Sequence, residues 1–422
     1  MTIEIMIAFS LCVLFTLSIF SLVFSMQRLK VWSVNELEKT KDASHRVMVK
    51  DFASSSIPLG NDTEMFPEDP FTFTLSIFKD GWGRTSCWPR FPDIQSVENF
   101  TYFNQGIELG ASNKSTDLEV HNGFMYLTAD ANTSAPPDLY IVDARSPGTS
   151  TLISSLNTGP GLSALEVAGP YVFAAHSSTV SQLQIINIED RAHPVLISSL
   201  RVPLPTPSTT PPFATSIFYK DGFIYLGTEK WAGPEFFVID VSNISIPTVV
   251  GSFETNTLIN DIYVRDDIAY LASSDSMQMR LVDVSVKSDP VLAGHFSPSG
   301  GQVQEGKIVE YFENRVGLGR TVGGFNVINN HEAFIFPTSI DMSTYFSHDI
   351  PGGVYGILLR PPFSLLLTHS LNTEFQVWDS TISTKLFDIP LGASPVKMSC
   401  DGPDFYFATG DHKGFSVLKF KE

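Results

Sequence analysis

Two aspartates, Asp117 and Asp261, are the residues of this 422-residue chain whose type and position fit a metal ion. Each stands at the beginning of an apolar segment typical of a strand. Carboxylates combined with backbone carbonyl oxygens form a donor set that Ca²⁺ accepts. The alternative is that both carboxylates face a water-filled space and hold no ion. We keep Asp117 and Asp261 as candidate metal residues and expect no other cofactor.

Motifs of common catalytic sites are missing from the sequence. The chain contains no G-x-S-x-G, no H-E-x-x-H and no Walker loop. Its nine histidines do not recur at one position of a repeat, so they indicate no ring of metal ligands. The sequence therefore names no catalytic residue.

An apolar phrase that ends in most copies in an acid or an amide recurs seven times. The copies are LYIVD (139–143), LQIIN (183–187), FFVID (236–240), MRLVD (279–283), FNVIN (325–329), FQVWD (375–379) and FSVLK (415–419). Their terminal residues are 44, 53, 43, 46, 50 and 40 positions apart, a spacing typical of propeller blades made of four short strands. The sequence predicts an all-β, seven-bladed β-propeller over residues 100–422.

The predicted blades contain turn chemistry on both sides of the phrase. A hairpin precedes it, as at Asp221-Gly222, where both residue types tolerate positive φ. A segment that starts with proline follows it, as at Pro194 and Pro247, which suits an outer edge strand. The terminal Asp or Asn of each phrase should accept the backbone N–H two residues further on.

The last unit ends without a fourth strand, which we expect residues 100–110 to supply. Residues 107–112 (IELGAS) resemble residues 389–394 (IPLGAS), where the fourth strand of the preceding unit ends. Such a strand would close the ring by hydrogen bonds and remove its open edge.

Closure also makes a prediction about the cysteines. Cys87 precedes the closing strand and Cys400 lies in the first strand of the last unit, so both belong near one blade. We predict a Cys87–Cys400 disulfide; the alternative is two unrelated buried thiols. On chain-entropy grounds a loop of this length contributes about 3–5 kcal/mol.

Residues 5–26 differ from the rest because they carry no charge and could cross a bilayer as a helix. A membrane anchor, a cleaved secretory signal and a pilin-like helix are three interpretations, of which the missing basic n-region weakens the secretory signal. We expect a helix over residues 1–51 with a transmembrane half, and a linker and irregular segment over 52–99.

Residues 2–9 (TIEIMIAF) resemble the N-terminus of type IV pilins and pseudopilins. In that family one glutamate lies in an otherwise apolar helix, and Glu4 is the matching residue here. The resemblance implies a role for Glu4 in assembly, with the amino terminus of a neighbouring pilin-like subunit as its partner. The alternative places Glu4 among lipid head groups. No basic leader peptide precedes the motif, and Arg28 and Lys30 favour a cytoplasmic C-terminal side, although long domains translocate regardless of such charges.

The phrases, together with V-S-N-x-x-x-P at residues 241–247, resemble LVIVD repeats, a β-propeller family of surface and secreted proteins. The resemblance covers residues 117–420 and departs from the pattern at residues 329–331 and at Lys419. It implies an extracytoplasmic propeller. With the pilin-like start, the chain resembles large surface subunits of type IV pilus-like systems.

The net charge of the chain limits the kinds of partner it can bind. The chain has 45 acidic against 27 basic residues, a net charge of −18, which argues against nucleic acid. We expect a non-enzymatic, membrane-anchored cell-surface or pilus-associated protein whose propeller binds a protein or glycan, with Trp82, Trp88 and Trp231 as candidate contacts. The alternative is an extracytoplasmic propeller enzyme of the hydrolase or lactonase type, with perturbed acids at its channel mouth.

Overall fold

The computed structural model describes most of the chain beyond residue 85. The described residues are 46–49, 75–78, 86–87, 94, 96–104, 106–110, 113–130, 136–146, 148–207, 209–298, 304–321, 331–338, 341–392 and 394–421. The predicted transmembrane span at 5–26, with Glu4, lies outside them. So do Trp82 and Trp88.

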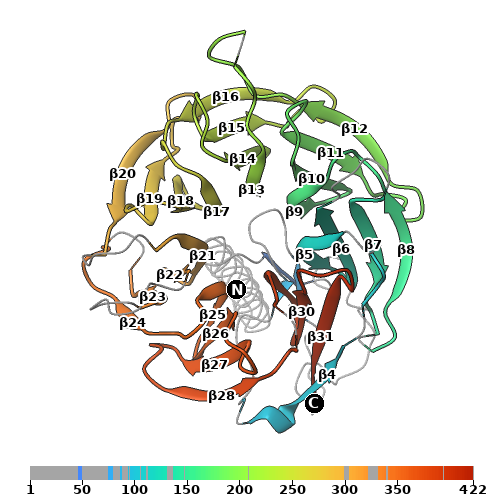
Figure 1. The fold of residues 1–422 in the computed structure, drawn as a ribbon, viewed down its shortest axis with the longest axis vertical. Coiled ribbons are helices and arrows are strands. Elements are labelled where there is room, and N and C mark those ends of the chain that lie inside the picture. Colours follow the sequence, from blue (N-terminus) through green and yellow to red (C-terminus); the bar gives the residue numbers. More distant parts are fainter. Residues whose placement is uncertain are drawn as a thin grey trace, which may run out of the picture.

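Seven antiparallel sheets stand around a central axis like the blades of a propeller (Figure 1). The first strands of successive blades are neighbours around the ring, so they line the centre, and the fourth strands form the rim. This confirms the predicted seven-bladed β-propeller with four-stranded blades.

The blades follow in chain order. Blade 1 is β5 (Lys114–His121), β6 (Phe124–Asp130), β7 (Leu139–Asp143) and β8 (Thr151–Leu156); blade 2 is β9 (Leu162–Ala168), β10 (Tyr171–His176), β11 (Leu183–Asn187) and β12 (Val195–Leu200). Blade 3 is β13 (Ala214–Lys220), β14 (Phe223–Thr228), β15 (Phe236–Asp240) and β16 (Thr248–Phe253); blade 4 is β17 (Ile259–Arg265), β18 (Ile268–Ser273), β19 (Met279–Asp283) and β20 (Val291–Phe296). Blade 5 is β21 (Gly306–Phe312), β22 (Arg315–Arg320), β23 (Ala333–Phe336) and β24 (Phe346–His348); blade 6 is β25 (Val354–Arg360), β26 (Phe363–Thr368), β27 (Phe375–Asp379) and β28 (Lys385–Ile389). Blade 7 contains β29 (Lys397–Gly402), β30 (Asp404–Ala408) and β31 (Phe415–Phe420).

The ring closes through an N-terminal strand, as predicted. Strand β4 (Phe100–Phe103), which follows the short 3₁₀ turn η1 (Val97–Asn99), pairs antiparallel with β31 and completes blade 7. The closing strand is shorter than the predicted 100–110, because residues 106–110 pair with no strand. On the inner side of the same blade, β3 (Ser86–Cys87) adds a fifth, parallel strand beside the end of β29.

The prediction that residues 325–329 (FNVIN) form the third strand of blade 5 is wrong. Its third strand is β23, which pairs with β22, whereas residues 325–329 lie outside the described part of the chain. FNVIN was chosen because it ends in an asparagine, as the phrase of blade 2 does. The structure instead uses AFIF, whose four side chains are all buried.

The expected helix does not extend to residue 51. Residues Arg46–Val49 form β1, which pairs antiparallel with β2 (Leu75–Phe78). Valines at 47 and 49 favour a strand, because β-branched side chains fit the pleated backbone better than a helix.

The hydrophobic core lies between neighbouring blades. Its largest cluster joins blades 3, 4 and 5 through buried side chains of their inner strands. Aromatic rings connect them, with Phe218 and Tyr263 centred 4.9 Å apart and Tyr263 and Tyr311 6.0 Å apart. Because each sheet buries its faces against its neighbours, one blade alone has no core, and each blade depends on its neighbours for stability.

Candidate functional site

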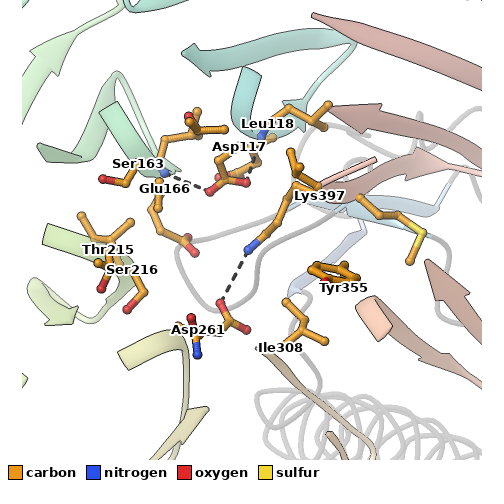
Figure 2. A pocket seen from close by; sticks show the side chains of 18 of the residues that line it. Asp117, Leu118, Ser163, Glu166, Thr215, Ser216, Asp261, Ile308, Tyr355 and Lys397 are labelled. Atoms are coloured by element: carbon orange, nitrogen blue, oxygen red, sulfur yellow. Dashed lines mark hydrogen bonds and ion pairs between the residues drawn. The ribbon is translucent and has the colours of Figure 1, made fainter. Parts of the chain in front are cut away.

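A cavity of about 280 Å³ opens where the innermost strands begin (Figure 2). We call this side of the propeller the mouth face, and the side where those strands end the far face. The cavity is lined by Thr116, Asp117, Leu118, Glu119, Ser163, Ala164, Leu165, Glu166, Thr215, Ser216, Ile217, Asn260, Asp261, Lys307, Ile308, Tyr355, Val396, Lys397 and Met398. Every blade therefore contributes at least one side chain.

A ring of inter-blade hydrogen bonds surrounds the mouth. The innermost strands of blades 1 to 4 each carry a β-bulge near their start, and the residue in the bulge donates a hydrogen bond to a backbone carbonyl of the next blade. The bonds run from Thr116 Oγ1 to Leu162 O (2.6 Å), Ser163 Oγ to Ala214 O (2.5 Å), Thr215 Oγ1 to Ile259 O (2.6 Å) and Asn260 Nδ2 to Gly306 O (2.7 Å). These polar groups hold blades 1 to 5 in register.

Asp117 and Asp261 both line the cavity, as their positions at strand starts predicted. Each carboxylate accepts a backbone N–H of the next blade: Asp117 Oδ2 from Leu165 at 3.1 Å, and Asp261 Oδ2 from Val309 at 2.9 Å. Asp117 Oδ1 also accepts the N–H of Leu118. Among the described residues, no group of His, Cys, Asp and Glu side chains is arranged to hold a metal ion. A calcium site at these aspartates stays a prediction, and their contacts give them a structural role.

Blades 5 to 7 depart from the ring of short polar side chains. Lys307 occupies the bulge position of blade 5, and its Nζ lies 3.3 Å from Asn260 Oδ1. Tyr355 occupies it in blade 6, with its ring stacked on His369. From blade 7, Lys397 Nζ reaches to 3.5 Å from Asp261 Oδ1 on the opposite side of the channel (Figure 2). In blades 5 to 7, the long side chains of Lys307, Tyr355 and Lys397 thus replace the short polar side chains that blades 1 to 4 carry.

Burial changes the acid–base properties of this wall. It lowers the pKa of Lys307, an effect that Lys397 reinforces and the carboxylates of Glu305 and Asp261 oppose. Burial likewise raises the pKa of Tyr355. The tyrosine therefore stays a hydrogen-bond donor at neutral pH.

Carboxylates gather on the wall formed by blades 1 and 2. Glu119 and Glu166 are almost completely buried, and Glu119 Oε2 accepts the N–H of Val167 at 2.8 Å. Glu166 points into the cavity (Figure 2). The cavity has an acidic wall and a wall that contains lysines.

A second set of repeated polar residues, which was not predicted, stands just before the third strands. The residue before the third strand is a buried acid or amide in six blades, namely Asp138, Gln182, Glu235, Gln278, Glu332 and Glu374. These side chains bond the segment that leaves the fourth strand, as when Glu235 Oε2 accepts the N–H groups of Thr255 and Asn256 at 2.9 Å. An acid or amide stands one position before five of the seven phrases. The same pattern, applied to Glu332, would have located β23.

The terminal residues of the phrases form the turns that were predicted. In blades 1, 2, 3, 4 and 6 the terminal Asp or Asn accepts the backbone N–H two residues further on, at distances from 2.8 to 3.1 Å. These residues are therefore turn formers on the far face.

Cys87 and Cys400 form a disulfide, with Cα atoms 4.9 Å apart and a sequence separation of 313. Both are fully buried in the core of blade 7. Trp231, expected as an exposed contact, is instead half-buried; its indole N–H donates to Pro234 O at 2.7 Å and its ring packs on the core. In the part of the chain that the structure describes, no helix is long and apolar enough to span a membrane.

Sheets, ring and closing strand together define a seven-bladed β-propeller. Within it, LVIVD repeats are recognised at residues 214–255 and 259–297, which are blades 3 and 4. No curated protein sequence is significantly similar to the chain.

Solved structures similar to this chain share its fold at low sequence identity. The WD40 domain of Neurospora crassa Pan2 aligns with a TM-score of 0.56 and 11% identity, over 78% of this chain and 98% of that one. A chain of the mitotic checkpoint complex aligns with a TM-score of 0.54 and 11% identity, over 79% and 95%. The β-propeller domain of Myceliophteria thermophila Cps50 (Swd1) gives 0.50 and 9%, over 75% and 98%. At such identities these similarities show the fold alone.

Proposed function

We propose that this chain is a non-enzymatic binding scaffold outside the cytoplasm, held at a membrane by residues 5–26, whose propeller presents its mouth face to a protein or glycan. The position of β3 carries the proposal. This strand lies beside Asp401 and Gly402, at the end of the innermost strand of blade 7. Strands β3 and β4 therefore attach the N-terminal part of the chain to blade 7, and the loops of the other blades are left for a partner.

Two further observations support this role. The buried Cys87–Cys400 disulfide is typical of proteins in oxidising compartments. The loops of the mouth face expose apolar side chains, with 75% of Val180, 42% of Phe213 and 83% of Leu371 accessible. These side chains are available for contact with another macromolecule.

Use of the channel carboxylates supports a scaffold over a hydrolase. Asp117, Glu119 and Asp261 each accept a backbone N–H of the neighbouring blade. Acids that hold blades together are restrained in position. Catalysis of the hydrolase type instead requires acids that exchange protons with a substrate.

Labelling of intact cells tests the location. Leu371→Cys on the mouth face and Val286→Cys on the far face, 57% exposed, each introduce one accessible thiol. We expect a membrane-impermeant maleimide to label both variants without permeabilisation. Labelling only after lysis would contradict the proposal.

The pilus-associated form of the proposal rests on Glu4 and is tested separately. We expect Glu4→Gln to remove the protein from a sheared filament fraction while it stays in the membrane fraction. Asp51→Asn, which removes one carboxylate beyond the apolar span, is the matched control and should leave the distribution unchanged. An equal filament content in both variants would leave the protein a plain membrane-anchored scaffold.

A further inference from the structure

We infer that the cavity at the mouth binds a small zwitterion of the α-amino acid class, with its carboxylate at Lys307 and Tyr355 and its ammonium at Glu166. The inference goes beyond the scaffold role and does not depend on membrane attachment. The first observation is that the series of inter-blade hydrogen bonds stops at blades 5 and 6, where Lys307 and Tyr355 take the place of short polar residues.

Donors on the lysine wall have more hydrogen-bonding capacity than the protein uses. An ammonium has three N–H donors, yet Lys307 Nζ has one acceptor at 3.3 Å and Lys397 Nζ one carboxylate oxygen at 3.5 Å. The Tyr355 hydroxyl donates to no group among the described residues, although stacking on His369 holds its ring in place. By contrast, the short polar side chains of blades 1 to 4 are satisfied by the next blade. The unused donors fit a carboxylate.

The carboxylates of the cavity disfavour a ligand that carries only negative charge. Four carboxylates line the cavity (Asp117, Glu119, Glu166 and Asp261), against the two ammonium groups of Lys307 and Lys397. An anionic ligand would add to the negative charge of these carboxylates, which are almost fully buried, so repulsion is stronger than in water. A ligand with its own cation removes that repulsion. Glu166, directed into the cavity, is the carboxylate placed to receive the cation (Figure 2).

Size and apolar lining narrow the class further. Pockets for drug-sized molecules measure about 300–1,000 Å³, so 280 Å³ selects a smaller ligand. Ile308, Val396 and Met398 line the cavity beside the lysines and would contact a short aliphatic side chain. Valine has both charges and such a side chain, and it serves as the probe.

Calorimetry on the full-length protein in detergent tests the inference. L-valine, isobutylamine (which lacks the carboxylate) and isovalerate (which lacks the ammonium) are titrated in parallel. We expect saturable binding of L-valine and at least tenfold weaker binding of each single-charge compound. Equal binding of isobutylamine and L-valine, or no binding of any of the three, would overturn the inference.

Two variants test whether Lys307 and Tyr355 bind the carboxylate of the ligand. Lys307→Met and Tyr355→Phe should each weaken L-valine binding about tenfold or more, because each removes a hydrogen bond to a charged group. Lys385→Met, on the outer strand of blade 6, is the matched control and should bind as the native protein does. The Tyr355→Phe change removes one oxygen and keeps the ring, so it reports on binding even if Lys307→Met fails to fold. Unchanged affinity in Tyr355→Phe and in a folded Lys307→Met would contradict the assignment. Intracellular protein that still binds L-valine would refute the proposed location and leave this inference intact.

Discussion

Asp261 Oδ1 and Lys397 Nζ lie 3.5 Å apart and join blade 4 to blade 7 across the channel (Figure 2). The carboxylate is almost fully buried, with 3% of its side chain accessible, whereas the lysine is 20% accessible. The same carboxylate accepts the N–H of Val309 from blade 5. One aspartate therefore links three blades, two of them neighbours and the third on the opposite side of the ring.

Loss of the lysine should destabilise the ring. We expect Lys397→Met to lower the free energy of unfolding by about 1–2 kcal/mol, because it leaves a buried carboxylate without its cation; the partial exposure of the pair keeps this below the 3–5 kcal/mol of fully buried pairs. Urea unfolding in the absence of added ligand measures the change.

An exposed pair provides the control. Lys385 Nζ contacts Asp388 Oδ2 on the outer strand of blade 6, with 39% and 29% of the side chains accessible. Lys385→Met should change the stability by no more than about 0.5 kcal/mol. Equal losses in the two variants would show that the cross-channel pair has no special contribution.

Removal of the disulfide should loosen the closure of the ring. Cys87→Ser and Cys400→Ser are each expected to cost about 3–5 kcal/mol, since the bond restrains the unfolded chain over a loop of 313 positions. Thermal unfolding with and without reductant measures the effect, which reductant should reproduce in the native protein. Cys12→Ser is the control and should unfold like the native protein. A native protein insensitive to reductant would contradict a stabilising bond.

Asp138, the acid that precedes β7, should make stability depend on pH. Burial raises the pKa of its carboxyl to about 6, although bonds from the N–H and hydroxyl of Thr158 oppose the rise. The unfolded value is near 3.8. Because the folded pKa is the higher one, the contribution of this group is complete below pH 3.8 and is lost as the pH rises through 6.

An amide should remove that dependence. Glutamine occupies the equivalent position in blades 2 and 4, as Gln182 and Gln278, so the site accepts a neutral side chain. We expect Asp138→Asn to gain about 2 kcal/mol over the native protein at pH 7 and to show no gain at pH 4. Denaturant unfolding across this pH range measures the difference. A constant difference between variant and native protein would contradict the raised pKa.

How much of this could be predicted from the sequence depends on the range of each interaction. The phrases and their Asp and Asn turns are local, since Asp240 bonds an N–H two residues away, and they were predicted. The third strand of blade 5 was predicted wrongly because FNVIN ends like the other phrases, whereas the strand is set by the burial of Ala333–Phe336. The inter-blade hydrogen bonds of Thr116, Ser163, Thr215 and Asn260, and the Asp261–Lys397 pair, join different blades. Their partners are set by closure of the ring, which residue spacing does not encode.

The turn at Asp240 gives a last test, of the meaning of the repeated phrase. Its Oδ1 accepts the N–H of Ser242 at 2.8 Å. Asp240→Ala should cost about 1 kcal/mol, the usual net contribution of one hydrogen bond. Asp240→Asn should cost less, because Asn187 makes the same bond to Glu189 in blade 2. Thermal unfolding of the two variants measures both changes. If alanine and asparagine were equally tolerated, the repeated geometry of the turn would not depend on the side chain, and the acid or amide of the phrase would need a different explanation.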